Sequence, residues 1–424
     1  MSTIINATQF FLDHIGQRLT PVRQRWFYIF IAWRFLLWIV MIVAQATVLS
    51  TGKWTQYLYF LSTARLTDGG YYPLINHWIE YPPIFPWLNA LLYRLSRWLM
   101  AGPDSIVLFY ALLGLVFTLA EIGLLVLIYR MVRYLADGKL ATTAAFIFAL
   151  TSWPTYLFYG WYDPIAAFFL LWALERLLVG RFYTSAVAAV LGFLTKLFPL
   201  MLVAVVWRIE ASIRRRILYT LVAGGVIALV LIPFAIISPE MMAATLRWLP
   251  NKSTYGTVYA LIDGYYSFGT APGALQFIDP NTANWIGHPS RIPNSLVTVV
   301  FGLIGLYVYF RPRPANPKMA ILVLSALIMQ LMLLYLKGYG PQFILWFQPL
   351  IILILPDARG LWYSLCLAIL NVLEYPLYFT FWETIYPIMG VVVLARTAIW
   401  ILLAIEYWRI YRGRASLPLT ASGS

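Results

Sequence analysis

Charged residues and cysteine are scarce in this sequence. Only 11% of its 424 residues are Asp, Glu, Lys or Arg, and only one is cysteine, Cys366. Soluble domains carry about one quarter charged residues, so the sequence excludes an ordinary soluble protein. A single cysteine excludes an intramolecular disulfide. Two of the three histidines, His77 and His288, stand in no cluster with metal-ligand spacing, so we expect them to pack or hydrogen-bond, and we expect no metal and no cofactor.

Apolar residues dominate instead. They make up 62% of the chain, and the mean hydropathy is +0.78. Long runs without strict alternation favour helices over the strands of a barrel. The sequence therefore predicts an all-α fold: one integral membrane domain, residues 1–424, built as a bundle of about twelve transmembrane helices. The predicted spans are Trp26–Val48, Ser105–Ile128, Leu140–Trp153, Pro164–Leu178, Tyr183–Leu194, Leu197–Trp207, Ile217–Ile237, Pro293–Phe310, Met319–Leu336, Gln342–Leu355, Gly360–Phe379 and Pro387–Ile405.

The basic residues are distributed as a membrane topology requires. The formal net charge is +14, but the basic residues lie in short segments between spans and form no nucleic-acid motif. Lys and Arg gather on cytoplasmic loops, so both termini are expected in the cytoplasm of a multi-pass protein of a bacterial or archaeal plasma membrane, or of the ER in a eukaryote. We expect membrane lipids, and no nucleic acid, as partners. The predicted cytoplasmic set is Arg18, Arg23, Arg25, Arg130, Arg133, Lys139, Arg176, Arg181, Arg208, Arg214, Arg215, Arg216, Arg311, Arg313, Lys318, Arg359, Arg409, Arg412 and Arg414.

Two predicted external loops are long. They span residues 49–104 and 238–292 and are expected to form the functional face. In the first, Trp87–Met100 has apolar residues at helical spacing with Arg94 and Arg97 between them, which predicts a helix in the membrane interface.

Two acids of the first loop are candidates for a general base. Glu80 opens the stretch EYPPIFPW, whose three prolines predict an irregular segment that fixes the carboxylate. Asp68 precedes Gly69 and Gly70, which suits either a turn or a carboxylate that approaches its substrate closely.

Other polar residues on the predicted outer face are candidates for substrate binding. Asp163 lies at membrane depth, where an ionisable residue suggests function, although a helix cap is the alternative. Lys196 and Lys337 end apolar runs and could snorkel, yet with Arg291 they make an anion site plausible. Ionisable residues within the spans, Glu121, Glu374 and Arg396 among them, are expected to be paired or to line a cavity. The full candidate set is His77, Tyr81, Asp163, Lys196, His288, Arg291, Lys337 and Gln342.

Three segments in this order are typical of one superfamily. The stretches GGYYPLINHWIEYPPIFPWL, TKLFPLML and KGYGPQFILWFQPL resemble those of the GT-C membrane glycosyltransferases. Within this superfamily the chain looks most like the family-87 enzymes, which are mannosyltransferases that use polyprenyl-phosphate mannose. The resemblance implies an inverting transferase on the outer or luminal face. It would move a sugar, mannose in that family, from a polyprenyl-phosphate donor to a lipid or glycan acceptor.

The base and its alternatives stay open at this point. Relatives carry their acid early in the first loop, whereas residues 47–67 contain neither Asp nor Glu. The role is therefore divided between Asp68 and Glu80, with Asp68 preferred, and Lys337, Lys196 and Arg291 are the candidates for the phosphate. A multi-span transporter or lipid flippase is the rival interpretation, although transporters tend to contain internal repeats and this chain has none. A non-catalytic subunit of a glycan-assembly complex is the third.

Overall fold

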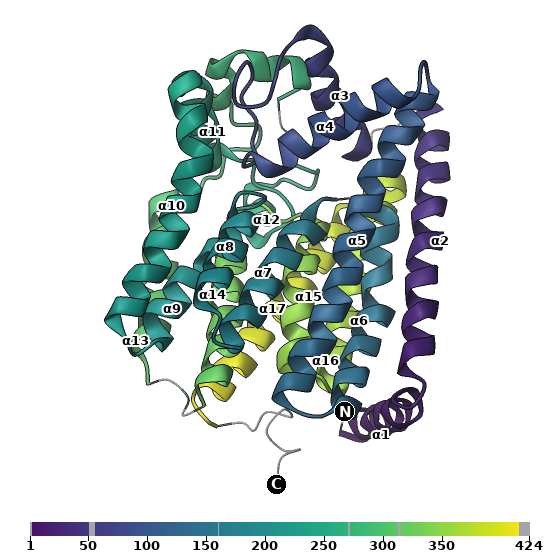
Figure 1. Ribbon diagram of the computed structural model, residues 1–424, viewed down its shortest axis with the longest axis vertical. Coiled ribbons are helices and arrows are strands. Elements are labelled where there is room, and N and C mark those ends of the chain that lie inside the picture. Colours follow the sequence, from purple (N-terminus) through teal and green to yellow (C-terminus); the bar gives the residue numbers. More distant parts are fainter. Residues whose placement is uncertain are drawn as a thin grey trace.

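The computed structural model describes residues 2–50, 56–159, 161–269, 272–312, 314 and 316–414. Helices make up most of these residues, and no β-strand occurs among them beyond two isolated bridges (Figure 1). All twelve predicted spans fall on helical segments, so the prediction of an all-α fold is confirmed.

Six helical segments are long and apolar enough to cross a membrane. They are Arg23–Ala44 of α2 (Arg23–Ser50), α5 (Asp104–Leu135), α10 (Ile213–Ile237), α14 (Pro317–Tyr335), Ala358–Phe379, which begins with α16 (Ala358–Val372), and α17 (Tyr386–Tyr411). The other predicted spans coincide with α6 (Gly138–Tyr159), α7 (Asp163–Leu178), α8 (Phe182–Phe193), α9 (Leu202–Ile209), α13 (Asn294–Phe310) and α15 (Ile344–Ile354). Most of these are shorter than the ~20 residues of a straight span, so the number twelve stays a prediction.

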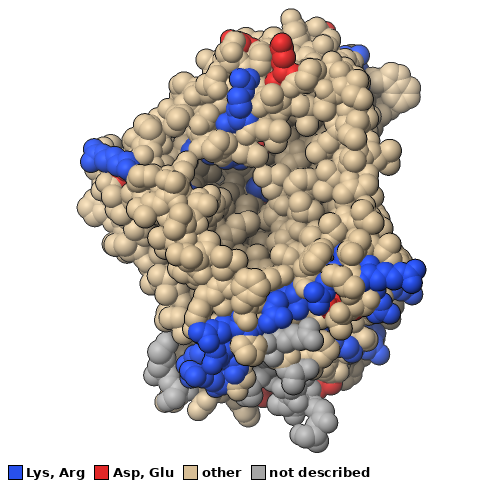
Figure 2. Space-filling view, turned by 90° about the vertical axis from the view of Figure 1, so that its left-hand side faces the viewer, with Lys and Arg blue, Asp and Glu red and all other residues tan. Residues whose placement is uncertain are grey.

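The two long loops lie together at one end of the bundle. They carry α3 (Gln56–Arg65), α4 (Ile84–Leu99) and α11 (Pro239–Trp248) at the upper end of Figure 1, and α1 (Ser2–Leu19) lies at the lower end. Figure 2 shows Lys and Arg gathered in a band across the lower part of the molecule. This separation is the one that the positive-inside rule requires if the loop-rich end is external.

Cysteine labelling tests that orientation. After Cys366 is replaced by serine, a cysteine at Asp68 or Lys252 should react with an impermeant thiol reagent in intact cells. One at Arg215 should react only after permeabilisation, because the basic end is expected in the cytoplasm. All three side chains are accessible, with exposed fractions of 45%, 44% and 61%. Labelling at Arg215 in intact cells would reverse the topology.

The predicted interfacial helix exists but begins earlier than expected. α4 starts at Ile84 and ends at Leu99, and it packs against α3 and α5. The expectation that three prolines keep the whole stretch irregular is therefore wrong. Pro82 and Pro83 precede the helix, and Pro86 lies in its first turn, where a backbone N–H has no intrahelical partner to lose.

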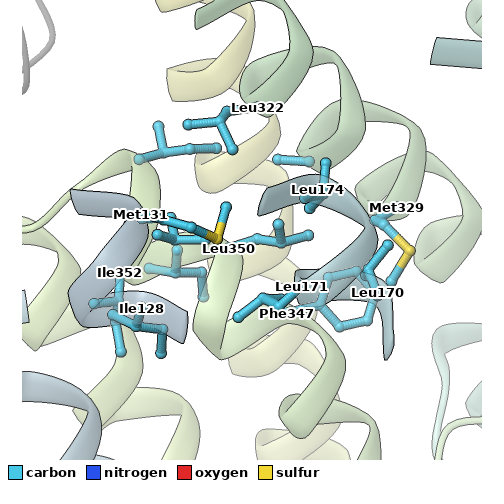
Figure 3. Close-up of a cluster of buried hydrophobic side chains, with 14 of the residues drawn as sticks. Ile128, Met131, Leu170, Leu171, Leu174, Leu322, Met329, Phe347, Leu350 and Ile352 are labelled. Carbon is cyan, nitrogen blue, oxygen red and sulfur yellow. The ribbon is translucent and has the colours of Figure 1, made fainter. Parts of the chain in front are cut away.

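Two hydrophobic cores of different composition meet inside the molecule. The core of the bundle is largely aliphatic; in Figure 3 side chains of α5, α7, α14 and α15 interdigitate, among them Ile128, Leu171, Leu322 and Leu350. The core beneath the outer loops is rich in aromatic residues that come from α3, α4, the start of α5 and the second loop. Tyr and Trp suit this position, because each has an apolar ring and one polar group for a hydrogen bond.

Candidate functional site

The three sequence segments that support the resemblance converge where the two cores meet. The backbone N–H of Ile84, in the first segment, donates to the carbonyl of Leu194, next to the second segment, at 2.9 Å. Lys196 of the second segment lies over the rings of Phe343 and Trp346 of the third, at 5.0 and 4.5 Å from the ring centroids. The segments are remote in sequence, so this convergence is a property of the fold.

A buried ion pair forms the floor of this site. The Lys196 ammonium lies 2.7 Å from Oδ1 of Asp163, and the Asp163 side chain is fully buried. The indole N–H of Trp346 donates to the same oxygen at 2.5 Å. Tyr162 supplies another ring below the ammonium, 5.0 Å away. Lys196 is thus held among aromatic faces and does not snorkel.

Asp163 is not a helix cap. α7 begins at Asp163 with Pro164 in its first turn, and no side chain caps that end by hydrogen bonding. The second carboxylate oxygen, Oδ2, is buried and has no hydrogen-bond partner among the described residues. Among the described residues, Asp163 Oδ2 is therefore a buried hydrogen-bond acceptor that no donor contacts.

Glu80 lies in the same aromatic surroundings. Its carboxylate accepts hydrogen bonds from the phenol of Tyr59 and the indole of Trp248, each at 3.4 Å, and lies 3.6 Å from the ammonium of Lys252. Its side chain is 16% exposed, against 44% for Lys252. A carboxylate that is oriented by several donors and still reachable from outside is suited to proton transfer.

The phenols beside Glu80 stay protonated. Burial raises the pKa of Tyr59 and of Tyr81 well above that of a free tyrosine, and the negative charge of Glu80 raises both further. Tyr81 packs edge-on against Tyr59 and Tyr162. The tyrosines thus act as neutral hydrogen-bond donors and apolar walls rather than as bases.

Asp68 has different neighbours. It lies in a 3-10 turn, residues Leu66–Gly69, that ends at Gly70 with φ 80°, as the Asp-Gly-Gly pattern predicts for a turn. The phenol of Tyr93 donates to Asp68 Oδ2 at 2.6 Å, and Arg94 lies 3.6 Å from Oδ1. Both partners belong to α4. Glu80, and not Asp68, shares the aromatic surroundings of Asp163 and Lys196.

His77 packs beneath the first loop. Its side chain is fully buried, Nδ1 lies 3.0 Å from the carbonyl of Trp78, and Nε2 has no partner among the described residues. Burial lowers the pKa of His77, and the hydrogen bond to Trp78 opposes the shift in part. His77 is therefore part of the support of the loop, as the packing interpretation expects.

We expect this histidine to make stability depend on pH. Its folded pKa lies below the unfolded value of 6.5, so stability is complete above that pH and falls as the pH decreases below it. The loss should approach about 1.4 kcal/mol per pH unit at most. Unfolding in detergent between pH 7.5 and 5 measures it. His77→Gln should flatten the profile, and His14→Gln, at an exposed position of α1, should not; equal profiles for the two variants would contradict the prediction.

Lys337, Arg291 and His288 hold the second outer loop together. The Lys337 ammonium donates to the carbonyl of Ile292, and burial lowers its pKa. Arg291 contributes its backbone N–H, which donates to Asp263 at 2.9 Å. His288 stacks on Tyr265 and contacts the carbonyl of Thr254 at 3.2 Å. None of these contacts reaches Glu80, Asp163 or Lys196.

Gln342 lies closer to the ion pair. It is buried in the short turn Pro341–Phe343, one residue before the Phe343 ring that faces Lys196. A Cβ at Gly340 would lie 2.3 Å from its Oε1, so the glycine makes room for this side chain.

Sequence reasoning missed several residues of the site. Lys252 is not among the candidates that the sequence marks, although the structure pairs it with Glu80. Trp346 lies within the third segment and Tyr162 directly precedes the candidate Asp163, but nothing in their spacing shows that they enclose a lysine. Figure 2 shows a hollow in the face that it presents, below the loop-rich end, with basic atoms inside it.

Comparisons with known proteins give little further identification. No family model matches the chain, and no curated protein matches it. A solved structure, the apo crystal structure of the oligosaccharyltransferase of Archaeoglobus fulgidus, aligns over 91% of this chain and 56% of its own length, with 14% identity and a TM-score of 0.36. The chain thus spans little more than half of that protein. A likeness of this degree does not by itself establish a shared fold.

The fold and the site together define a class of protein. The protein belongs to the all-helical class and has six candidate membrane spans among its described residues. At its loop-rich end, two acid–lysine pairs, Glu80–Lys252 and Asp163–Lys196, lie among tyrosines and tryptophans.

Proposed function

We propose that this protein is an inverting membrane glycosyltransferase that moves a sugar from a polyprenyl-phosphate donor to a hydroxyl of a lipid or glycan acceptor. The observation that supports it best is the convergence of the three GT-C-like segments on the two acid–lysine pairs. The three segments therefore contribute to one group of charged residues, which lies at the end of the bundle that we expect outside the membrane.

Glycosyl transfer from a phosphate requires two charges in separate places. The acceptor oxygen forms a bond to the anomeric carbon, a base takes its proton, and the bond from that carbon to the phosphate oxygen breaks with its electron pair. The leaving phosphate then needs positive charge. Glu80 is the proposed base, because it is oriented by Tyr59 and Trp248 and reachable from outside.

Lys252 and Lys196 supply the positive charge in this proposal. Lys252 is the more exposed of the two and lies against Glu80, so a phosphate that binds it also draws the ammonium away from the carboxylate. The base is then free to accept a proton. Lys196, paired with Asp163, places a fixed positive charge in the deeper part of the site, where its ammonium lies over the ring of Trp346.

Mannose is the proposed sugar because of the resemblance to family-87 enzymes. The aromatic rings around Glu80 offer flat apolar faces to a sugar ring and to the isoprenoid chain.

The decisive experiment uses purified protein in liposomes. Polyprenyl-phosphate mannose and a membrane lipid extract are supplied, and new glycolipids are sought by mass, with glucose and galactose donors in parallel. A product with inverted anomeric configuration supports the proposal. Movement of the donor across the bilayer without any product would support the transporter interpretation instead.

A further inference from the structure

A second buried ion pair lies next to the proposed site. Arg396 of α17 pairs with Glu374, and the two side chains are 2% and 0% exposed. The prediction that ionisable residues within the spans are paired is confirmed here and for Arg34 and Glu121, which lie 3.0 Å apart. A buried ion pair by itself is weak evidence for a stabilising role. The other contacts of Arg396 therefore indicate what this residue does.

Arg396 makes two contacts beyond Glu374. Its second terminal nitrogen donates to the carbonyl of Gly256, and its guanidinium lies 3.7 Å from the centre of the Tyr339 ring. Gly256 belongs to the second outer loop, and Tyr339 to the KGYGPQF segment. One side chain from the bundle thus holds two segments that are remote in sequence.

These two segments are joined directly by backbone hydrogen bonds. We call residues 253–257 the outer strap. The N–H of Tyr255 donates to the carbonyl of Lys337 at 3.2 Å, and the N–H of Tyr339 donates to the carbonyl of Tyr255 at 2.9 Å. The fit is tight, since a Cβ at Gly256, where φ is +61°, would lie 2.5 Å from the Tyr339 carbonyl oxygen.

The outer strap adjoins the proposed site at its start and at its centre. Lys252, which pairs with Glu80, directly precedes it. Tyr255 is half-buried within it, and the pKa of this tyrosine is raised first by burial and then by the charges of Glu80 and Glu374. Tyr255 therefore lies within electrostatic reach of both the proposed base and the partner of Arg396.

We propose that Arg396 is a positioning residue, which fixes the outer strap through Gly256 and Tyr339 and so sets Lys252 against Glu80 and the donor phosphate. This inference rests on the proposed function. Arg396 itself touches neither Glu80 nor Lys252 in any contact of the described residues. Its planar guanidinium is what allows one side chain to bind a carboxylate and a carbonyl and to stack on a ring.

Arg396→Lys separates these contacts. A lysine keeps a positive charge for Glu374 but has no flat fork with which to hold Gly256 and Tyr339 as well. We expect kcat/KM for the polyprenyl-phosphate donor to fall about 10²-fold, the effect of a misplacement of about 1 Å in an active site. Arg34→Lys is the matched control, because Arg34 pairs with Glu121 and donates to Ser152, neither of which belongs to the outer strap, and it should leave kcat/KM within about threefold of wild type.

A double-mutant cycle distinguishes positioning from a purely structural role. If Arg396 acts through Lys252, then adding Arg396→Lys to Lys252→Ala should lower kcat/KM much less than it does in the wild-type background. Equal effects in both backgrounds, or an equal loss with Arg34→Lys, would overturn the proposal.

Amide hydrogen exchange provides a readout that needs no activity. Arg396→Lys should accelerate exchange at Tyr255 and Tyr339, whose N–H groups join the two segments, and Arg34→Lys should not. If wild type transfers no sugar, the proposed function fails, while this local exchange still decides whether Arg396 holds the outer strap. Unchanged exchange at both amides would refute the role even in an active enzyme.

Discussion

Glu80→Gln is expected to reduce turnover by about 10²–10⁴-fold, the usual effect of removing a well-placed general base. The amide keeps the shape of the side chain, and its one carbonyl oxygen can still accept either the Tyr59 bond, made at Oε1, or the Trp248 bond, made at Oε2, but it cannot take the acceptor's proton. Donor binding should therefore persist. Initial rates with saturating donor, together with donor affinity from equilibrium binding, measure the two effects separately.

Asp68→Asn is the matched control for this experiment. Each acid belongs to the first loop, and each lies 3.6 Å from one basic partner, Arg94 or Lys252. Asp68 is 45% exposed and directed toward α4, so its replacement should change turnover by less than about threefold. The opposite pattern, with Asp68→Asn inactive and Glu80→Gln active, would restore the assignment that the sequence alone favours.

The neighbours of Asp68 depend on contacts that local sequence patterns do not contain. Gly69 and Gly70 correctly predict a turn, and the turn is present. What the carboxylate meets depends on α4, since Tyr93 and Arg94 lie about 25 residues further along the chain. A helical pattern in Trp87–Met100 predicts that helix, but not which of its faces turns toward Asp68.

The helices themselves follow from the sequence for a simple physical reason. In lipid the backbone must satisfy its own hydrogen bonds, so a long apolar run has almost no other conformation available. The runs at α2, α5, α10, α14 and α17 accordingly lie where the sequence predicts them. Short helices such as α8, with 12 residues, follow a different rule, since a helix well below ~20 residues is too short to cross alone and fits either one part of a broken span or a segment buried in the bundle.

The site is harder to predict because its members pair over long distances. Asp163 and Lys196 are 33 positions apart, and Trp346 lies 183 positions beyond Asp163. The sequence names both charged residues as candidates, yet it gives equal weight to Lys337, which the fold directs to Ile292 instead. Lys252 escapes notice because a single lysine in an external loop looks the same whether or not an acid faces it.

Lys196→Met is expected to destabilise the protein by about 3–5 kcal/mol, as removal of one partner from a buried ion pair commonly does. Asp163 is fully buried, and its carboxylate would then keep the Trp346 indole as its side-chain donor among the described residues, with no opposing charge. Methionine retains most of the side-chain volume among Tyr162, Phe343 and Trp346, so the loss reflects charge and not an empty cavity. Denaturant unfolding in micelles measures it, and Arg94→Met, which breaks the exposed pair with Asp68, should shift stability by no more than about 1 kcal/mol.

The double variant Lys196→Met/Asp163→Asn separates folding from function at this pair. With both charges removed, most of the lost stability should return, because no uncompensated charge stays buried. Turnover should nevertheless stay about 10²-fold or more below wild type, since the deeper part of the site has lost the cation that we propose to stabilise the leaving phosphate. A double variant that regains both stability and turnover would show that Asp163 and Lys196 only hold the fold together. In that case Lys252 would be the sole proposed source of positive charge for the phosphate.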